Sequence, residues 1–405
     1  MYKINNFFKI SVLLIIIFSS FLFGFFSYRN QNFLYVAIAK IYYFFESQNP
    51  KLLDDDFTEI ENILNSNEFI NNQKLYAEDI YNYVNNNSKS FRNDLINKII
   101  LPKEIIKINQ KEPIDNYYFK KFFSKNIKNK FVIKVKFYEI ENFGILEKEN
   151  NKKLFIFIGD QGASRTPLEY EKLIELKEEI KKKGYDILTL SLAGIGYNRH
   201  EKNISFPSNP NLKRINISKE SFKKIITGNT KYLRHIWLSY YDKNYPELFP
   251  ISLFLSGNYY IIKRLENNYD EIIMVGLSGG AWQATMLSSL IPKIKYSYSF
   301  AGSIPKSFSV PSWNPHELMG GESRLWHQYD LWHFYFLSLF DENGLQNRDH
   351  NLIYGADDKC CFYPPYSSSF DKFTEELSIK GLDVIILENH GHHIEKEILM
   401  KKLIN

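Results

Sequence analysis

Short apolar runs alternate with longer amphipathic runs from about residue 130 onward. Phe131–Tyr138 alternates apolar and polar residues with a period of two, which predicts a strand with one buried face. Leu154–Ile158 is apolar throughout, which is typical of a strand buried on both faces. Comparable runs predict further strands at Asn142–Glu147 (a hairpin partner of the first), Tyr185–Leu192, Glu271–Val275, Lys295–Phe300, Asn351–Tyr354 and Asp383–Leu387.

Amphipathic runs between these strands predict helices at Pro167–Lys183, Ala281–Leu290 and Phe370–Lys380. Buried strands that alternate with helices indicate an α/β fold, with a mostly parallel central sheet and helices on both faces. Two insertions, residues 199–250 and 305–347, interrupt the alternation. The first is polar, with a helical stretch at Ser221–Tyr241.

The second insertion is dense in aromatic residues and histidine, and we interpret it as a helical cap over the site. Its aromatic side chains either line an acyl or aromatic pocket or pack the cap against the core. The residues concerned are Trp313, His316, Trp326, His327, Trp332, His333 and Tyr335.

The N-terminal run Ile10–Phe26 carries no charge and is preceded by Lys3 and Lys9. A bilayer-spanning helix needs ~20 apolar residues, and this run approaches that length. Because no small-x-small cleavage signature follows it, we interpret residues 1–30 as an uncleaved membrane anchor. The two lysines favour a single-pass protein with its body on the extracytoplasmic (periplasmic) side. A cleaved signal peptide, which would give a secreted protein, is the alternative.

Residues 31–128 are predicted to form a helical accessory or spacer region. Asn32–Glu46 is apolar and aromatic at helical spacing, so it either continues the anchor or lies along the membrane surface. From about residue 47 the pattern indicates helical segments separated by Asn-rich breaks, one of them at Asn85–Ser88. The region contains no chemical motif, and the sequence identifies no protein partner.

The charge pattern argues against a nucleic-acid partner. The net charge of +5 comes from Lys and Arg spread thinly in short runs such as Lys181–Lys183, with no basic stripe interleaved with aromatics. The only two cysteines, Cys360 and Cys361, are adjacent and cannot staple distant parts of the fold. We interpret them as free thiols, with a strained, labile vicinal disulfide as the alternative.

The most specific motif is Gly276–Gly280, with the sequence Gly-Leu-Ser-Gly-Gly, which joins a predicted strand to a predicted helix. Glycines allow the sharp turn, and the positive N-terminal end of the helix points at the serine. Strand, tight turn, serine and helix form the nucleophile elbow of hydrolases. We predict that Ser278 is a catalytic nucleophile, with a purely structural glycine turn as the alternative.

A serine nucleophile needs a histidine base, which needs a carboxylate to fix its tautomer. In a parallel sheet such groups follow the C-terminal ends of strands. Gly355–Asp358 and Glu388–His393 each follow a predicted strand, so the chain order is serine, aspartate, histidine. The candidates are Asp357 and Asp358 for the acid, and His390, His392 and His393 for the base.

Residues 129–405, with these motifs, resemble the α/β-hydrolase fold family. In that family the acid commonly falls three residues after the glycine that closes its strand, which implies Asp358, with Asp357 as the alternate. The base commonly follows a glycine, as in Gly391-His392, which implies His392, with His390 and His393 as alternates. The resemblance implies a single hydrolase domain that carries both insertions.

Two backbone N–H groups should bind the oxyanion of the reaction. One belongs to Gly279, directly after the nucleophile. The other should come from the loop Gly159–Ser164, and by position we assign Gln161. Family members usually carry His-Gly at the start of this loop, whereas this chain has Gly159-Asp160, so an ordinary glycine-rich turn stays open as the alternative. The later Gly194–Tyr197 is a turn signal without the features of a phosphate loop.

The histidine cluster also raises a metal-site interpretation, with His390, His392 and His393 beside Asp357, Asp358 or the cysteines. The chain lacks an H-E-x-x-H motif, and a triad accounts for His392 and Asp358 more economically. We therefore expect neither a metal nor a cofactor.

The sequence thus predicts a membrane-anchored serine hydrolase. Its expected reaction is cleavage of carboxylic esters of a small-molecule or lipid-like acyl substrate, through an acyl-enzyme. Amide, peptide or thioester hydrolysis on the same triad is one alternative. A non-catalytic, membrane-anchored binding protein that keeps the fold is the other.

Overall fold

The computed structural model describes residues 60–109, 130–137, 140–159, 171–192, 198, 250–309, 328–358, 362 and 364–404. The chain divides into Met1–Ile60 and Glu61–Asn405, and the fold below is that of the second unit. The predicted anchor, the Ser221–Tyr241 stretch, the Gly194–Tyr197 turn and both cysteines lie outside the described residues. Among the helices that the structure does describe, none has the length and apolar character needed to span a bilayer.

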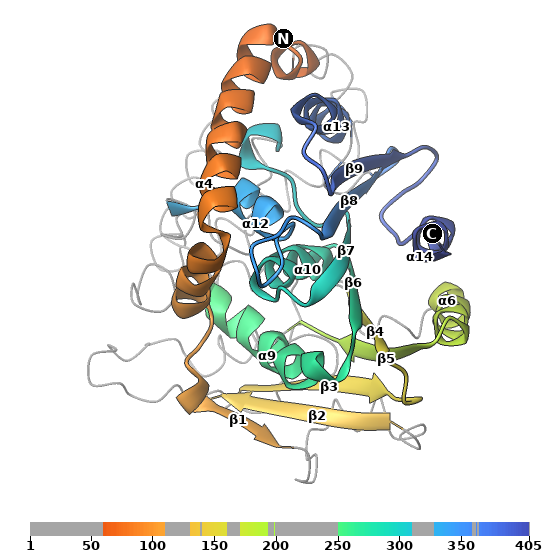
Figure 1. The fold of residues 1–405 in the computed structure, drawn as a ribbon. Coiled ribbons are helices and arrows are strands. Elements are labelled where there is room, and N and C mark those ends of the chain that lie inside the picture. Colours follow the sequence, from red (N-terminus) through yellow and green to blue (C-terminus); the bar gives the residue numbers. More distant parts are fainter. Residues whose placement is uncertain are drawn as a thin grey trace, which may run out of the picture. The chain divides into compact units, whose positions relative to one another are not determined.

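Nine strands of the described residues form one sheet, in the order β1-β2-β3-β5-β4-β6-β7-β8-β9 (Figure 1). Their bounds are β1 Ile106–Asn109, β2 Lys130–Phe137, β3 Ile140–Glu147, β4 Lys153–Ile158, β5 Tyr185–Leu190, β6 Glu271–Leu277, β7 Ile294–Phe300, β8 Asp349–Gly355 and β9 Leu382–Leu387. Every strand predicted from the hydrophobic pattern is present, and β1 is an addition that the pattern did not reveal.

The first three strands of the sheet are antiparallel and the rest are parallel. β1 pairs with β2, β2 with β3, and β3 with β5 in antiparallel register, so β2 and β3 form the predicted hairpin. From β5 through β4, β6, β7 and β8 to β9 all neighbours are parallel. The C-terminal ends of β6, β8 and β9 therefore meet at one edge of the sheet.

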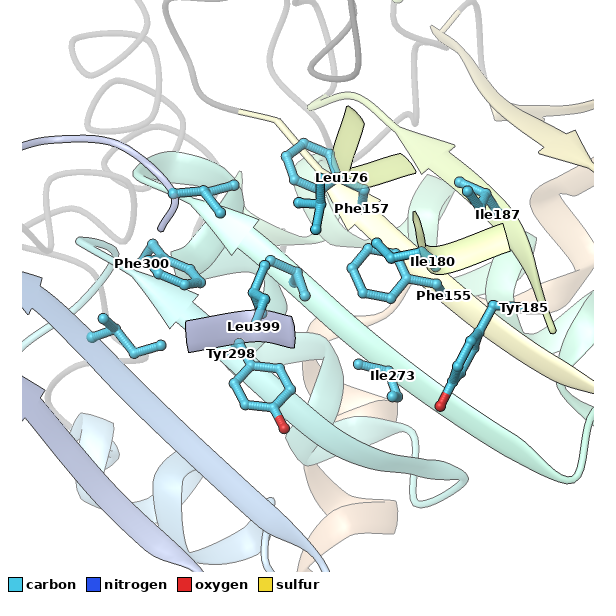
Figure 2. Close-up of a cluster of buried hydrophobic side chains, with 13 residues drawn as sticks. Phe155, Phe157, Leu176, Ile180, Tyr185, Ile187, Ile273, Tyr298, Phe300 and Leu399 are labelled. Carbon is cyan, nitrogen blue, oxygen red and sulfur yellow. The ribbon is translucent and has the colours of Figure 1, made fainter. Parts of the chain in front are cut away.

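Helices cover both faces of this sheet, as predicted (Figure 1). On one face α6 (Glu171–Lys182) and α14 (Lys396–Ile404) pack on the strands, with Leu176, Ile180 and Leu399 fully buried among strand side chains (Figure 2). On the other face lie α9 (Pro250–Leu265), α10 (Gly279–Leu290) and α13 (Tyr366–Leu377), which contact strands β3, β6 and β9 respectively. Phe155 and Phe157 of the central strand β4 belong to the buried cluster, as expected for a strand covered on both sides.

Helix α4 (Asn67–Ile99) corrects one prediction, because it runs unbroken through Asn85–Ser88, where a break was expected. Its buried positions recur at intervals of three and four residues, which gives a continuous stripe against the protein. The asparagines fall on the exposed side, and the Asn87 amide donates to the Tyr83 carbonyl at 2.9 Å. Tertiary packing of that stripe therefore outweighs the low helix propensity of asparagine. The buried residues of α4 are Ala77, Ile80, Val84, Ser88, Phe91, Arg92, Leu95 and Ile99.

Arg92 joins α4 to two other helices. Its side chain is buried, and its guanidinium donates to the carbonyl of Ser289 at 2.9 Å and to that of Leu337 at 3.1 Å. These carbonyls lie in the last turns of α10 and of α12 (Leu331–Leu337), where helix carbonyls have no intrahelical partner. A cation at a helix C-terminus is also favoured by the helix dipole.

The proposed boundary between residues 31–128 and 129–405 stays a prediction, but α4 belongs to the same compact unit as the sheet.

Among the described aromatic residues of the second insertion, Trp332 and Tyr335 are buried, whereas Tyr329 and His333 are partly exposed. Trp332 and Tyr335 of α12 have 0% exposure, and they contact the ring of Phe370 on α13. These two side chains therefore follow the core-packing interpretation. Trp313, His316, Trp326 and His327 lie outside the described residues.

Candidate active site

Ser278 occupies the turn between β6 and α10 in a strained backbone conformation. Its φ of 56° and ψ of −123° lie where residues with a side chain rarely occur. The turn is fixed on both sides, because the Ser278 N–H donates to the Phe300 carbonyl at 2.8 Å and the Ser278 carbonyl accepts from Trp282 N–H at 3.0 Å. Such strain costs about 1–3 kcal/mol and clusters at functional sites. This is the elbow geometry expected from the motif.

Helix α10 begins at Gly279, directly after the serine. The first N–H groups of a helix have no intrahelical acceptor, and together they carry the positive end of the helix dipole. The Gly279 N–H is therefore placed to donate to a negative oxygen that develops on an acyl group bound to Ser278 Oγ.

The second predicted oxyanion donor, Gln161, lies outside the described residues. The start of its loop does contact the nucleophile turn. A Cβ atom on Gly280 would lie 2.3 Å from the Ile158 carbonyl oxygen and 2.4 Å from that of Gly159. Only glycine permits this approach, so the loop after β4 leaves the sheet against the first turn of α10.

Asp358 follows β8 and has 0% exposure, whereas its neighbour Asp357 is exposed. Both residues lie in a tight turn, in which the Asp358 N–H donates to the Gly355 carbonyl at 3.1 Å. The turn directs the two carboxylates into different environments, and of the two it is Asp358 that meets a histidine.

His392 follows β9, and its Nδ1 lies 2.8 Å from Oδ2 of Asp358. The His392 side chain keeps 24% of its surface exposed, while its partner has none. Because a carboxylate only accepts, the imidazole Nδ1–H is the donor, which leaves Nε2 with the lone pair. That tautomer is the one a general base uses toward a serine hydroxyl.

The loops that carry Asp358 and His392 are held together by their backbones. The Asp357 N–H donates to the His390 carbonyl at 2.9 Å, and the Ala356 N–H donates to that of Leu387 at 2.9 Å. These bonds continue the β8–β9 pairing past the ends of the strands. The contact between Asp358 and His392 is therefore positioned by the pairing of β8 with β9.

The alternate bases occupy other positions. His390 has 5% exposure and its Nε2 lies 2.9 Å from the His393 carbonyl oxygen. His393 is exposed, and its ring centroid lies 3.8 Å from that of His390. The structure thus brings Asp358 to His392 and sets His390 and His393 against each other.

A buried polar cluster between α10, β7 and β8 was missed from the sequence. His350 has 0% exposure, with Nδ1 2.5 Å from Ser297 Oγ and Nε2 3.4 Å from Thr285 Oγ1. Burial and the nearby Arg348 charge lower the pKa of His350 to about 3, so it is neutral. The alternating polar residues of β7 were the only available signal, and they do not identify their partners.

The sequence matches no protein-family model, and no curated protein sequence matches it significantly. Solved structures are similar at low identity. Est1E from Butyrivibrio proteoclasticus is 13% identical, covering 67% of this chain and 95% of that one, with a TM-score of 0.35. Acetyl xylan esterase 1 from Thermoanaerobacterium sp. JW/SL YS485 is 12% identical, covering 78% and 93%, with a TM-score of 0.36. An acylaminoacyl peptidase is 16% identical, covering 68% and 40%, with a TM-score of 0.38.

The strand order decides the fold. Setting β1 aside, an antiparallel hairpin precedes six parallel strands, β5 and β4 are exchanged, and an elbow serine follows β6. The fold is that of the α/β hydrolases. In this fold the elbow, the acid turn after β8 and the histidine loop after β9 share one edge of the sheet.

Proposed function

We propose that this protein is a serine hydrolase in which Ser278, His392 and Asp358 form the catalytic triad. The observation that carries the proposal is the 2.8 Å contact between His392 Nδ1 and the fully buried Asp358 carboxylate. It occurs at the sheet edge where the strained elbow holds Ser278. A histidine in a fixed tautomer at the same sheet edge as an elbow serine fits the arrangement that activates a hydroxyl for acyl transfer.

In the proposed reaction Ser278 Oγ attacks a carbonyl carbon while His392 Nε2 takes the hydroxyl proton. Asp358 stabilises the imidazolium that forms, and the Gly279 N–H, with that of Gln161, donates to the oxyanion. The tetrahedral intermediate collapses to an acyl-enzyme as His392 gives its proton to the leaving group. Water, deprotonated by His392, then attacks the acyl-enzyme and regenerates Ser278.

The substrates we assign are carboxylic esters of small-molecule or lipid-like acyl groups. An alkoxide is a better leaving group than an amide anion, so a triad of this kind cleaves an ester more easily than an amide. The uncharged run Ile10–Phe26, preceded by Lys3 and Lys9, supports the further proposal of a membrane-anchored enzyme with its catalytic body on the extracytoplasmic side.

The test is labelling of the full-length protein with a fluorophosphonate probe, which reacts with activated serines. The native chain is expected to label, and Ser278→Ala and His392→Ala are expected not to label while they remain folded by circular dichroism. Esters of graded acyl length then report the substrate preference. Labelling that persists in Ser278→Ala would overturn the assignment of the nucleophile.

A further inference from the structure

Three side chains that the proposed triad does not use lie together beside His392. They are His390, His393 and Glu395, and one ligand atom from each lies within 4.8 Å of the others. His390 is buried, His393 is exposed, and the Glu395 side chain is about one-third exposed at 34%. The cluster is therefore buried at His390 and open to solvent at His393.

The hydrogen bond of His390 fixes which of its ring nitrogens carries the proton. Its Nε2 lies 2.9 Å from the carbonyl oxygen of His393, and a carbonyl only accepts, so Nε2 is the N–H. In the neutral ring Nδ1 then holds a lone pair. This Nδ1 lies 3.4 Å from Oε2 of Glu395.

A ring nitrogen lone pair and a carboxylate at this distance repel each other, and a positive group between the two atoms removes the repulsion. A proton on Nδ1 would make an imidazolium–carboxylate hydrogen bond, which is usually about 2.7–2.9 Å long. The observed 3.4 Å is longer than that. Two ligand atoms on one tetrahedral ion lie about 3.3–3.4 Å apart when each bond to the ion is about 2.0–2.1 Å long. The distance between Nδ1 and Oε2 matches that value.

The surroundings of His390 also fit a metal ligand. Metal-binding histidines almost always donate their second ring N–H to a carboxylate, a carbonyl or water, and His390 Nε2 makes such a bond. The ring of His393 lies against that of His390, and one of its ring nitrogens lies within 4.8 Å of the ligand atoms of the other two side chains. Two imidazoles and one carboxylate are a ligand set that zinc favours.

Against the expectation from the sequence, we propose that His390, His393 and Glu395 bind a divalent cation of zinc type, with water completing the coordination. The ion closes the segment on either side of His392 into a ring. It also holds the His390 backbone, whose carbonyl accepts the Asp357 N–H next to Asp358. Its role is structural, since it clamps the histidine loop onto the acid turn.

The experiment measures zinc binding rather than turnover, so it does not depend on the proposed activity. Full-length protein, stripped of metal with a chelator, is titrated with zinc in competition with a chromophoric indicator. His393→Ala and Glu395→Gln are the test variants, because both residues are accessible and His390 is buried. Glu397→Gln, two residues further on and exposed, is the matched control.

The native chain is expected to bind a single zinc ion and to gain thermal stability with zinc, because the ion binds the folded state. Each test variant should weaken binding by more than about tenfold, since even changes around a metal ligand have effects of that size. Glu397→Gln should bind like the native chain, and magnesium should not compete, because it prefers oxygen ligands. Absence of zinc binding by the native chain would overturn the proposal, and so would test variants that bind zinc as tightly as the native chain does.

Discussion

A Cβ atom placed on Gly355 would lie 2.1 Å from the backbone carbonyl oxygen of His390. Gly355 is the last residue of β8, and His390 begins the segment that carries His392. The acid turn and the histidine loop therefore touch through backbone atoms, at a place where no side chain fits. The glycine before the acid is thus required by the contact between the two loops.

Gly355→Ala is expected to separate the two loops and to weaken the His392–Asp358 contact. A misplacement of about 1 Å can lower a catalytic rate by about 100-fold, so fluorophosphonate labelling should slow by a factor of that order. The overpacking should also lower the free energy of unfolding by about 1–3 kcal/mol, as measured by urea denaturation.

The matched control for that change is Gly391→Ala in the same loop. Its added Cβ would have its nearest neighbours at 3.9 Å, which is an ordinary van der Waals distance. Labelling and stability should stay close to those of the native chain. If both alanine variants behaved alike, the contact between Gly355 and His390 would not be what positions the pair.

Asp358→Asn should impair the enzyme far more than Asp357→Asn. Asp358 is buried against His392, and an amide there favours the wrong imidazole tautomer, which costs about 10⁴-fold in kcat in Ser-His-Asp hydrolases. Asp357 is exposed, so its substitution should leave labelling nearly unchanged. Labelling rates of the two purified variants decide between them, and the reverse order would show that the acid is Asp357.

Arg92→Met should destabilise the protein strongly without altering the site directly. Burial lowers the pKa of Arg92 to about 10, with Asp341 opposing the shift, so the group stays charged at neutral pH. Methionine fills similar volume but removes the guanidinium N–H groups that donate to the Ser289 and Leu337 carbonyls. The free energy of unfolding should fall by about 3 kcal/mol.

The control for Arg92→Met is Arg264→Met on α9, where the side chain is exposed. Its unfolding midpoint in urea should match that of the native chain. A similarly small effect of Arg92→Met would mean that solvent replaces the guanidinium at the two helix ends.

Glu147 on β3 should make stability depend on pH in the acid range. Burial alone would raise its pKa, but hydrogen bonds from Lys177 and Lys181 lower the pKa from 4.5 to about 2. Because the folded pKa is the lower one, the stabilisation is present above about pH 4.5 and is lost as the pH falls toward 2. The stability difference between the native chain and Glu147→Gln should therefore narrow below pH 4.5.

Urea denaturation at several pH values measures that difference, with Glu178→Gln as the control. Glu178 also faces Lys181, at 3.5 Å, but its side chain is 57% exposed. An exposed ion pair contributes little, so this variant should follow the native chain at every pH. A pH-independent difference for Glu147→Gln would argue that its carboxylate is not ionised in the folded protein.

The sheet was predictable because its burial pattern leaves a direct trace in the sequence. Leu154–Ile158 is covered on both faces, so every one of its side chains must be apolar, and the observed strand begins only one residue earlier. Phe131–Tyr138 alternates because β2 has one better buried face, although its bounds shift by one residue at each end. Strand order, by contrast, is a long-range property, and local periodicity does not contain it.

Helix α4 shows where local signals fail. Asn85–Asn87 has low helix propensity, and only the stripe from Ala77 to Ile99 that packs on other helices keeps the segment helical. Arg92 also looks like an ordinary solvated charge in the sequence. Its burial depends on the ends of α10 and α12, which lie about 200 or more residues away along the chain.

At the site, the sequence supplied the residue types and their order along the chain, while the fold determines which atoms meet. Strand ends and glycines indicated Ser278, the Asp357–Asp358 turn and the histidine loop. The choice between adjacent residues depends on the turn after Gly355, which buries Asp358. The relation of His390 to Glu395 was hidden for the same reason, because it requires the orientation of a ring and the position of its proton.

The position of Arg92 has an evolutionary consequence. Its guanidinium meets the end of α10 opposite to Ser278, so a helix that precedes the sheet in the chain caps the helix that follows the proposed nucleophile. A recombination breakpoint between residues 99 and 130 would deliver a hydrolase core whose helix ends lack their cap. Lineages that shuffle domains should therefore inherit α4 and the core as one block. If the gene were split at this point, the two halves should function only when they are co-expressed.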